Sequence, residues 1–288
     1  MRKVLVTGAT GFLGNAIVKE LLRDDEFEVI AIGGRPEDKV NPLPGHPRLS
    51  SYLLDDLFTL SFTEVDTVIN CAFARSNDSA LLAQAFDFTE KLIDRLVTLK
   101  VKSVINISSQ GVYKRLPVGE LSTEDSPIEP IDLYSMAKYA SEKLFLISAI
   151  PHVTNVRLAS LMMPQRFLYF FVQKAKNGDS FTVTAPNQYA SLLDVKDAAS
   201  ALVAITKLAP ILRAAIYNLG IGRQYSLLDY AKSVKEIGEK FGYPVSFDIA
   251  DNKTDISSGM NCDRLMSETG WSPIFLKEEM IEDLFKTI

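Results

Sequence analysis

Short apolar runs and longer amphipathic stretches alternate along the first 160 or so residues of the chain. The apolar runs, rich in valine and isoleucine, occupy residues 4–6, 29–32, 65–72, 101–107 and 153–161. Helical patterns occupy residues 14–23, 79–99 and 134–149. Strands that are apolar on both sides are typical of a parallel sheet with helices on both faces. The pattern therefore predicts an α/β protein with a doubly wound sheet, whose ligands bind at the carboxyl ends of the strands.

The regular alternation ends after residue 161. Helical patterns recur at residues 167–176, 197–207, 227–241 and 277–288, and strand-like runs recur at 181–184, 192–195 and 215–219. This order predicts a dinucleotide-binding domain made of residues 1–161 and about 191–225. Residues 162–190 and 226–288 are expected to form a smaller C-terminal lobe that binds the substrate.

Composition narrows the function classes. The 288 residues are 47% hydrophobic, which suffices for a large core, and their net charge of -5 comes without a Lys/Arg cluster, which argues against a nucleic-acid partner. No apolar stretch approaches the roughly 18–20 residues of a membrane span, and the chain opens on strand residues without a signal peptide. Cys71 and Cys262 lack CxxC spacing and histidine neighbours, so no metal site is expected. We therefore expect a soluble, cytoplasmic protein.

Three glycines, each three residues from the next, lie between the apolar run 4–6 and the first helical pattern. A strand, a tight glycine turn and a helix bring backbone N–H groups and the positive helix end close to a diphosphate. Spaced glycines also occur in ordinary turns, so the turn indicates a nucleotide site and no reaction. With the strand pattern, it predicts a Rossmann-type sheet. The expected cofactor contacts are Gly8, Thr10, Gly11, Phe12, Leu13 and Gly14.

Tyr134 and Lys138 lie four residues apart in an expected helix, so their side chains share one face. A neighbouring ammonium favours the ionised form of a phenol and brings its pKa toward the range used for proton exchange with a substrate. The same spacing is frequent on ordinary amphipathic helices. Ser109 lies just beyond the apolar run 101–107, where its hydroxyl could bond either a substrate oxygen or its own turn backbone.

In this order and spacing, these elements resemble the extended short-chain dehydrogenase/reductases, a family of NAD(P)-dependent nucleotide-sugar epimerases, dehydratases and reductases. The resemblance covers nearly the whole chain. Its motifs here are the glycine turn, Asp56 and Leu57 on the adenine side, residues 70–74 beside the cofactor, Ser109, Tyr134 with Lys138, and the later segments 195–199 and 269–273.

The resemblance implies a role for each residue. Tyr134 is expected to be the acid/base of a hydride transfer, Lys138 to hold the nicotinamide ribose and lower the Tyr134 pKa, and Ser109 to polarise the reacting C–O group. The family also implies a homodimer, built here from the helices at 79–99 and 134–149. Further cofactor contacts are expected from Asp56, Leu57, Cys71, Ala72 and Phe73.

Two departures from the family pattern bear on the cofactor and the substrate. Gly33 ends the second strand, where NAD-preferring members carry an Asp, and Arg35 could pair with a 2′-phosphate. NADP is therefore expected, with NAD still open. Ser160 replaces an Asn that contacts the nucleotide diphosphate, which leaves Ser109 and Ser160 as the expected substrate contacts. The Met- and Phe-rich stretch 162–171 is expected to line a more apolar pocket or to be plain core.

The leading interpretation is an NADP-dependent oxidoreductase that reduces a keto group on a nucleotide-linked deoxysugar, and the expected partner is thus a nucleotide sugar. One alternative is a sugar-nucleotide 4-epimerase that retains its NAD. Another, of a different class, is a non-catalytic nucleotide sensor or scaffold. A dehydratase is disfavoured because Gln110 and Gly111 follow Ser109, where family dehydratases carry Asp-Glu, and neither can remove a proton.

The assignment of NADP predicts the behaviour of the Arg35→Ala variant. Its affinity for NADP is expected to fall about tenfold or more, because a charge-assisted pair with the 2′-phosphate contributes roughly 1.5–3 kcal/mol. Its affinity for NAD should not change. Isothermal titration calorimetry of both cofactors with wild type and variant checks this, and an NADP preference that survives the substitution contradicts the role given to Arg35.

Overall fold

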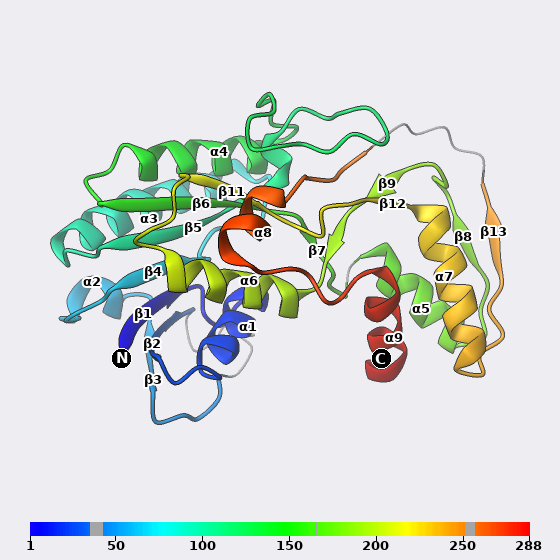
Figure 1. Ribbon diagram of the computed structural model, residues 1–288, viewed down its shortest axis with the longest axis horizontal. Helices are drawn as coiled ribbons and strands as arrows, with labels where there is room; N and C mark the ends of the chain where they lie inside the picture. The colour runs from blue at the N-terminus through cyan, green and yellow to red at the C-terminus, as the bar shows by residue number, and fades with distance from the viewer. Residues whose placement is uncertain (35–42, 165, 251–256) are drawn as a thin grey trace.

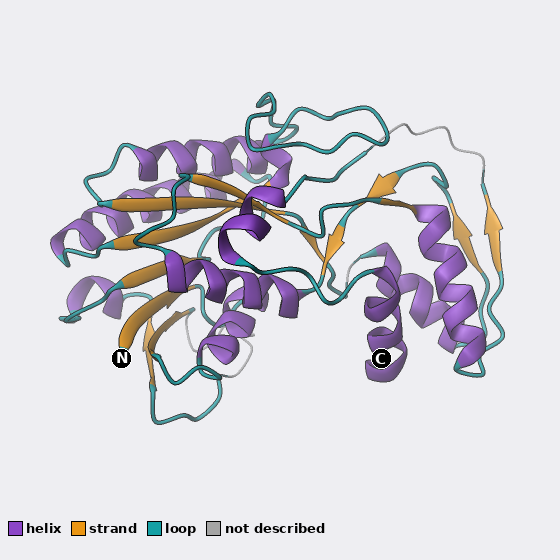
Figure 2. Ribbon diagram, viewed as in Figure 1, coloured by secondary structure: helices purple, strands orange, loops and turns teal. Residues whose placement is uncertain are grey.

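A seven-stranded parallel sheet forms the centre of the molecule in the computed structural model, which describes residues 1–34, 43–164, 166–250 and 257–288 (Figures 1 and 2). The strand order is β11-β6-β5-β4-β1-β2-β3. The order reverses beside β1, between the β1–β2 and β1–β4 pairs, and this confirms the predicted doubly wound sheet. The strands are β1 (Arg2–Thr7), β2 (Phe27–Gly33), β3 (Leu49–Leu53), β4 (Thr67–Asn70), β5 (Ser103–Ser109), β6 (His152–Leu158) and β11 (Ile216–Leu219).

Helices cover both faces of this sheet. They are α1 (Phe12–Leu21), α3 (Ser79–Thr98), α4 (Leu133–Leu146) and α6 (Val195–Leu208). The helix α1 packs against α6 on one face, and α3 packs against α4 on the other (Figure 1). Val4 and Val6 point into the first core and Leu5 into the second, so β1 is buried on both sides. Burial on both faces explains the continuous apolar runs of the sequence.

Side-chain caps fix where two of these helices begin. The Asp78 carboxylate accepts hydrogen bonds from the N–H groups of Ala80 and Leu81 at the start of α3. The Asp132 carboxylate accepts one from the Ser135 N–H at the start of α4. Such caps satisfy N–H groups that have no partner inside the helix. The Asp132 cap therefore places residue 134 in the first turn of α4.

A second core lies beside the sheet domain, on the right of Figure 1. Three helices, α5 (Phe167–Lys176), α7 (Leu227–Lys240) and α9 (Lys277–Thr287), pack on one another there, beside the parallel pair β8 (Phe181–Val183) and β13 (Phe247–Ile249). The rings of Phe171 and Phe181 stack in this core with centroids 4.3 Å apart. Short pairs link the two parts: β7 (Ser160–Leu161) with β10 (Leu192–Leu193), and β9 (Tyr189–Ala190) with β12 (Tyr225–Ser226).

Among the elements that the sequence pattern did not indicate are β3, α2 (Asp56–Thr59) and α8 (Asp263–Thr269). The strand β3 is a partly exposed edge strand, and α2 and α8 are too short to show a helical period. Although α8 lies within the 226–288 range expected for the lobe, it packs against β11 and α6 of the sheet domain. In the described part of the chain, no helix combines the length and the apolar character that crossing a membrane requires.

A chain of side-chain hydrogen bonds crosses four neighbouring strands at one level of the sheet. Thr7, Asn70, Asn106 and Asn155 are buried and share one register on β1, β4, β5 and β6. The Thr7 hydroxyl donates to Asn70 Oδ1 at 2.7 Å, and Asn70 Nδ2 donates to Asn106 Oδ1 at 3.0 Å. Asn106 Nδ2 donates in turn to Asn155 Oδ1 at 2.8 Å. A one-residue slip of a central strand would unpair buried amides, so this polar ladder fixes the register.

The polar ladder predicts a large loss of stability for the Asn106→Leu variant. The substitution leaves Asn70 Nδ2 and Asn155 Oδ1 buried without partners, at roughly 1–3 kcal/mol each, so the free energy of unfolding should fall by about 2–6 kcal/mol. Thr67→Val on β4 is the control, because the Thr67 hydroxyl is buried without a hydrogen-bond partner in the structure and its loss should cost little. Urea denaturation compares the three proteins. Equal stability of Asn106→Leu and wild type would show that the ladder does not hold the sheet.

Candidate functional site

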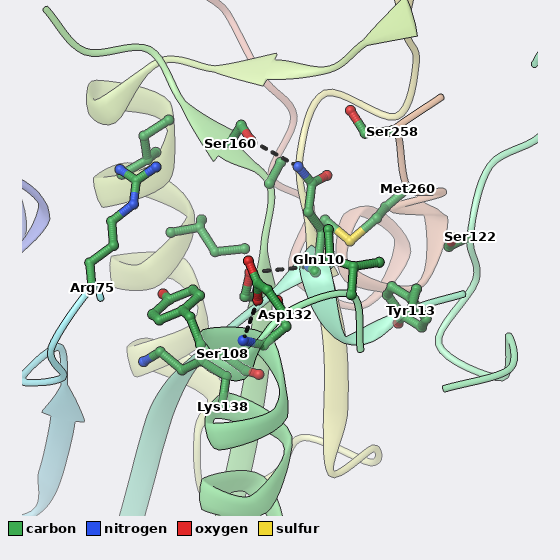
Figure 3. Close-up of a pocket in the computed structure, with 18 of the residues that line it drawn as sticks. Arg75, Ser108, Gln110, Tyr113, Ser122, Asp132, Lys138, Ser160, Ser258 and Met260 are labelled. Atoms are coloured by element: carbon green, nitrogen blue, oxygen red, sulfur yellow. Dashed lines mark hydrogen bonds between the residues drawn. The ribbon is translucent and has the colours of Figure 1, made fainter. Parts of the chain in front are cut away.

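A cavity of about 750 Å³ lies at the carboxyl edge of the sheet (Figure 3). Its walls come from the start of α1, the ends of β5 and β6, the first turns of α4 and the segments that follow β4 and β6. The predicted residues that line it are Phe12, Leu13, Cys71, Phe73, Ser109, Tyr134, Lys138 and Ser160. Residues far apart in the sequence thus meet where the strand pattern predicts a ligand.

The glycine turn allows α1 to begin very close to β1. Gly8 has a φ of +66°, and a Cβ there would lie 3.0 Å from the backbone of Cys71. A Cβ at Gly14 would lie 2.2 Å from the Gly8 carbonyl oxygen, so a larger residue would force helix and strand apart. Gly11 caps α1 without a side chain, and the first turn carries no acidic residue. No acidic side chain in this turn therefore offsets the positive N-terminal end of α1, and such a helix end favours binding of an anion.

Thr10 fills the space beside the end of β2. A Cβ on Gly33 would lie 2.7 Å from Thr10 Cγ2, and the Gly34 N–H donates to Thr10 Oγ1 at 3.1 Å. An acidic side chain at position 33 therefore requires Thr10 to move. Arg35, the predicted partner of a 2′-phosphate, lies outside the described residues.

The segment that follows β4 runs along the cavity. Cys71 and Phe73 line it, and the Ala72 N–H between them donates to the hydroxyl of Thr7 at 3.4 Å. Burial raises the pKa of the Cys71 thiol to about 12, although the charge of Lys138 opposes this. The thiol is therefore neutral near pH 7, and Cys71 and Phe73 form an uncharged part of the cavity wall.

Asp56 and Leu57 lie in a different setting, at the start of α2 beyond β3. The Asp56 carboxylate accepts a hydrogen bond from the Leu53 N–H at 2.9 Å. The Leu57 side chain is fully buried in the core under α3 and α4. Asp56 thus keeps one oxygen for other donors, whereas Leu57 has no side-chain surface to offer a ligand.

Lys138 is buried on α4, with 4% of its surface exposed. Its Nζ donates to the Ile107 carbonyl at 2.7 Å and lies 4.1 Å from the centre of the Phe73 ring. Burial lowers the pKa of the Lys138 ammonium to about 7, against the opposite effects of Cys71 and Glu142. Because an ammonium has three N–H donors, Lys138 retains donors for hydroxyl groups of a ligand in the cavity.

The Tyr134 ring packs edge-on against Phe73, with centroids 6.3 Å apart, and Lys138 Nζ lies 6.0 Å from its centre. Burial raises the pKa of the Tyr134 phenol, and the nearby cation that opposes this is Arg75. The expectation that Lys138 lowers the Tyr134 pKa stays a prediction, since Arg75 is the cation with a resolved effect on the phenol and Lys138 Nζ bonds the Ile107 carbonyl.

Ser109 ends β5, and its Oγ accepts a hydrogen bond from the Gly111 N–H at 3.1 Å. This is the turn-forming contact, and it leaves the hydroxyl proton for a ligand oxygen. The Ser160 hydroxyl accepts from Gln110 Nε2 at 2.9 Å, and Gln110 Oε1 is buried without a hydrogen-bond partner in the structure (Figure 3). Gln110 and Ser160 thus form a fixed polar pair on the cavity wall next to Ser109.

A buried ion pair holds α4 against the sheet. Arg157 Nε donates to Glu142 Oε1 at 3.0 Å and Nη2 to Oε2 at 2.8 Å, and both side chains are 2% exposed or less. The Ser108 hydroxyl donates to the same carboxylate at 2.5 Å. Since removal of one partner would strand a buried charge, this pair fixes α4 against β5 and β6.

The Met- and Phe-rich stretch 162–171 divides between the two expected settings, core and cavity wall. Met162 and Phe171 are buried in the second core, because they pack against α7 and α9. Met163 and Arg166 do line the cavity. Neither Arg166 nor Arg75, which follows β4, was predicted from the sequence. The position of Arg75 just beyond a strand end was the signal that could have found it.

Comparison with known proteins finds a family model, relatives and solved structures that match this chain. A model of the NAD dependent epimerase/dehydratase family matches residues 4–220. The low-salt glycan biosynthesis protein of Haloferax volcanii is 26% identical over 263 residues, which cover 81% of this chain and 81% of that protein. A UDP-N-acetylglucosamine 4-epimerase structure from Bacillus cereus matches with a TM-score of 0.81 at 19% identity, and covers 99% of both chains.

A second solved structure, a UDP-glucuronic acid 4-epimerase from Bacillus cereus, contains NAD and UDP-4-deoxy-4-fluoro-glucuronic acid. It matches with a TM-score of 0.80 at 18% identity, and covers 99% of this chain and 98% of that one. Both structural matches confirm the predicted Rossmann-type fold.

The pKa of Lys138 predicts how stability depends on pH. The folded-state pKa of about 7 lies below the ordinary lysine pKa of 10.5. Between these values the unfolded chain holds a proton that the folded chain has released, so stability rises with pH. The contribution of Lys138 is least favourable below about pH 7 and improves by about 1.4 kcal/mol per pH unit above it.

Lys138→Met removes this dependence. The free energy of unfolding, measured by urea denaturation from about pH 6 to 9, should therefore shift in favour of wild type over the variant as the pH rises. A difference that stays constant over this range would contradict the lowered pKa.

Proposed function

Because this chain belongs to the NAD dependent epimerase/dehydratase family, within the extended short-chain dehydrogenase/reductases, we propose that it reduces a keto group of a nucleotide-linked sugar by hydride transfer. The observation that carries the proposal is that Ser109, Tyr134 and Lys138, from β5 and α4, line one cavity with the start of α1. Their side chains supply a hydrogen-bond donor, an acid and a cation around one space.

The residues present suit a nicotinamide dinucleotide. The uncompensated start of α1 and its glycine turn suit the diphosphate, and the remaining N–H donors of Lys138 suit the ribose hydroxyls. When bound, the cofactor supplies the hydride. Asp56, Cys71, Ala72 and Phe73 stay in the proposal as further contacts, and Leu57 can contribute through its backbone alone.

Tyr134 acts in this proposal as the acid. Burial raises the pKa of its phenol, so the proton is present at neutral pH and available to the keto oxygen as that oxygen gains negative charge. The Ser109 hydroxyl donates a second hydrogen bond to the same oxygen. A protonated phenol is the form of Tyr134 that reduction of a keto group requires.

NADP remains the proposed cofactor. Thr10 occupies the space in which an acidic side chain at position 33 would repel a 2′-phosphate. The positive charge of Arg35 is the second support, from the sequence alone. NAD is the other candidate, because the solved UDP-glucuronic acid 4-epimerase holds NAD.

A nucleotide-sugar 4-epimerase that retains its NAD is the second candidate function. It is supported by two of the solved structures that match nearly all of the chain, which are 4-epimerases. A dehydratase is disfavoured because Gln110, beside Ser109 on the cavity wall, carries no carboxylate to remove a proton. The sensor or scaffold interpretation is disfavoured because Ser109, Tyr134 and Lys138 are all in place.

We also propose that the protein forms a homodimer through α3 and α4. The two helices pack side by side, and they expose Leu81, Leu133 and Met136 at 46%, 50% and 55% of their surfaces. Apolar side chains exposed on adjacent helices suit a second copy of the same helices. The proposal for the lobe is that residues 162–190 and 226–288 contribute the substrate side.

The proposed reduction predicts stoichiometric consumption of NADPH. Purified protein, incubated with dTDP- and UDP-linked 4-keto-6-deoxysugars, should oxidise one equivalent of NADPH for each product formed, as followed by the absorbance of the reduced cofactor. Tyr134→Phe should lower kcat by about 10²–10⁴-fold and leave cofactor affinity unchanged, because it removes the acid and keeps the ring.

Three outcomes would argue against parts of this proposal. Interconversion of UDP-sugar epimers without net change of cofactor would favour the 4-epimerase. Unaltered turnover by Tyr134→Phe would remove Tyr134 from the chemistry. Tight cofactor binding with no turnover on any keto-sugar or epimer pair would favour the sensor.

A further inference from the structure

Two arginines that no motif singled out line the same cavity, and both lie around Met163. Arg75 Nη1 lies 3.0 Å from Met163 Sδ, and the Arg166 N–H donates to the Met163 carbonyl at 2.9 Å. Within the described ranges, neither guanidinium forms an ion pair with a carboxylate. The charge of Arg75 also adds to burial in lowering the pKa of Arg166, which places the two cations close together.

One hydrogen-bond donor of Arg166 has no acceptor. Its Nε is buried and finds no acceptor in the structure. A buried guanidinium N–H without an acceptor costs free energy that a bound anion would offset with a charge-assisted bond. Arg166 is also the N-cap of α5, whose first turn contains no acidic residue, so the positive end of that helix adds to the charge of the arginines.

The surrounding charges leave this positive potential in place. Of the acidic residues on the cavity wall, Asp132 caps α4 through the Ser135 N–H, and Glu120 is exposed. Arg75 lies near enough to Tyr134 for its charge to lower the pKa of the phenol. Both arginines line the same cavity as the proposed acid.

We propose that Arg75 and Arg166 form an anion-binding subsite that holds a negatively charged group of the substrate, either its diphosphate or a carboxylate on its sugar. The inference rests on the proposed function, since it assigns the anion to the substrate of the same site. The cofactor is not the source, because its diphosphate belongs at the start of α1, whereas Arg166 stands at the start of α5. Bidentate guanidinium groups match both phosphate and carboxylate oxygens.

Inorganic pyrophosphate tests the subsite without any sugar or base. Isothermal titration calorimetry uses protein saturated with whichever of NADP and NAD it binds more tightly, so that the α1 site is filled. The double variant Arg75→Gln/Arg166→Gln should bind pyrophosphate roughly tenfold to a hundredfold more weakly than wild type. Arg213→Gln is the matched control, since Arg213 is exposed and outside the cavity wall, and it should bind like wild type.

Two results overturn the subsite: no pyrophosphate binding by wild type, or equal binding by wild type and the double variant. Unchanged cofactor affinity shows that each variant is folded. Arg75 is exposed, so Arg75→Gln alone, with an expected loss of several-fold, keeps the test available if the double variant does not fold.

UDP-glucose and UDP-glucuronate then distinguish the two sources of the anion. If the subsite holds the diphosphate, the double variant loses affinity for both compounds to the same extent. If it holds a carboxylate, the affinity for UDP-glucuronate falls and that for UDP-glucose does not. Unchanged affinity for both overturns the assignment to the substrate. Failure of wild type to bind either compound, with pyrophosphate binding retained, counts against the proposed function and leaves the subsite standing.

Discussion

The common register of β1, β4, β5 and β6 is the constraint on which the site depends. The polar ladder of Thr7, Asn70, Asn106 and Asn155 connects these strands at one level, and the segments that line the cavity begin just beyond it. A slip of any one strand would move its following segment by about one residue rise, roughly 3.3 Å, which is enough to separate groups that must share a substrate oxygen. Buried amides make such a slip costly, because an unpaired amide has no water to bond.

Polar contacts join the helix α4 to this edge of the sheet. They hold α4 and the strands β5 and β6 in fixed relative positions. Glu142 receives the Arg157 guanidinium and the Ser108 hydroxyl, and Lys138 bonds the carbonyl of Ile107. Every one of these groups is buried, so each would be left unsatisfied if α4 moved. The acid on α4 and the hydroxyl at the end of β5 thus keep their relative positions, which is what preorganised catalysis needs.

Local patterns in the sequence predicted the central strands of the sheet, the helices that cover it and eight of the residues that line the cavity. The glycine turn and the spacing of Tyr134 and Lys138 are local, so their geometry follows from one element each. The direction in which Lys138 points is set by Ile107 on β5 and by Phe73 in the segment after β4, and helix spacing alone therefore could not reveal these contacts. The edge strand β3 has a half-exposed pattern that does not differ from a loop.

Contacts between segments far apart in the chain could not be predicted from the sequence, for the same reason. Arg75 and Arg166 meet only because β4 and the start of α5 come together at one edge of the sheet. The Met- and Phe-rich stretch could be pocket or core by its sequence. Met162 and Phe171 belong to the core, where α5 packs on α7 and α9.

A crystal structure of the complex with NADP or NAD tests the account most directly. We expect the diphosphate to lie at the start of α1 and the nicotinamide ribose hydroxyls to lie within hydrogen-bond distance of Lys138 Nζ. The Tyr134 phenol and the Ser109 hydroxyl should face the same side of the nicotinamide ring. A dinucleotide bound elsewhere, or one whose nicotinamide lies out of reach of Tyr134, would contradict it.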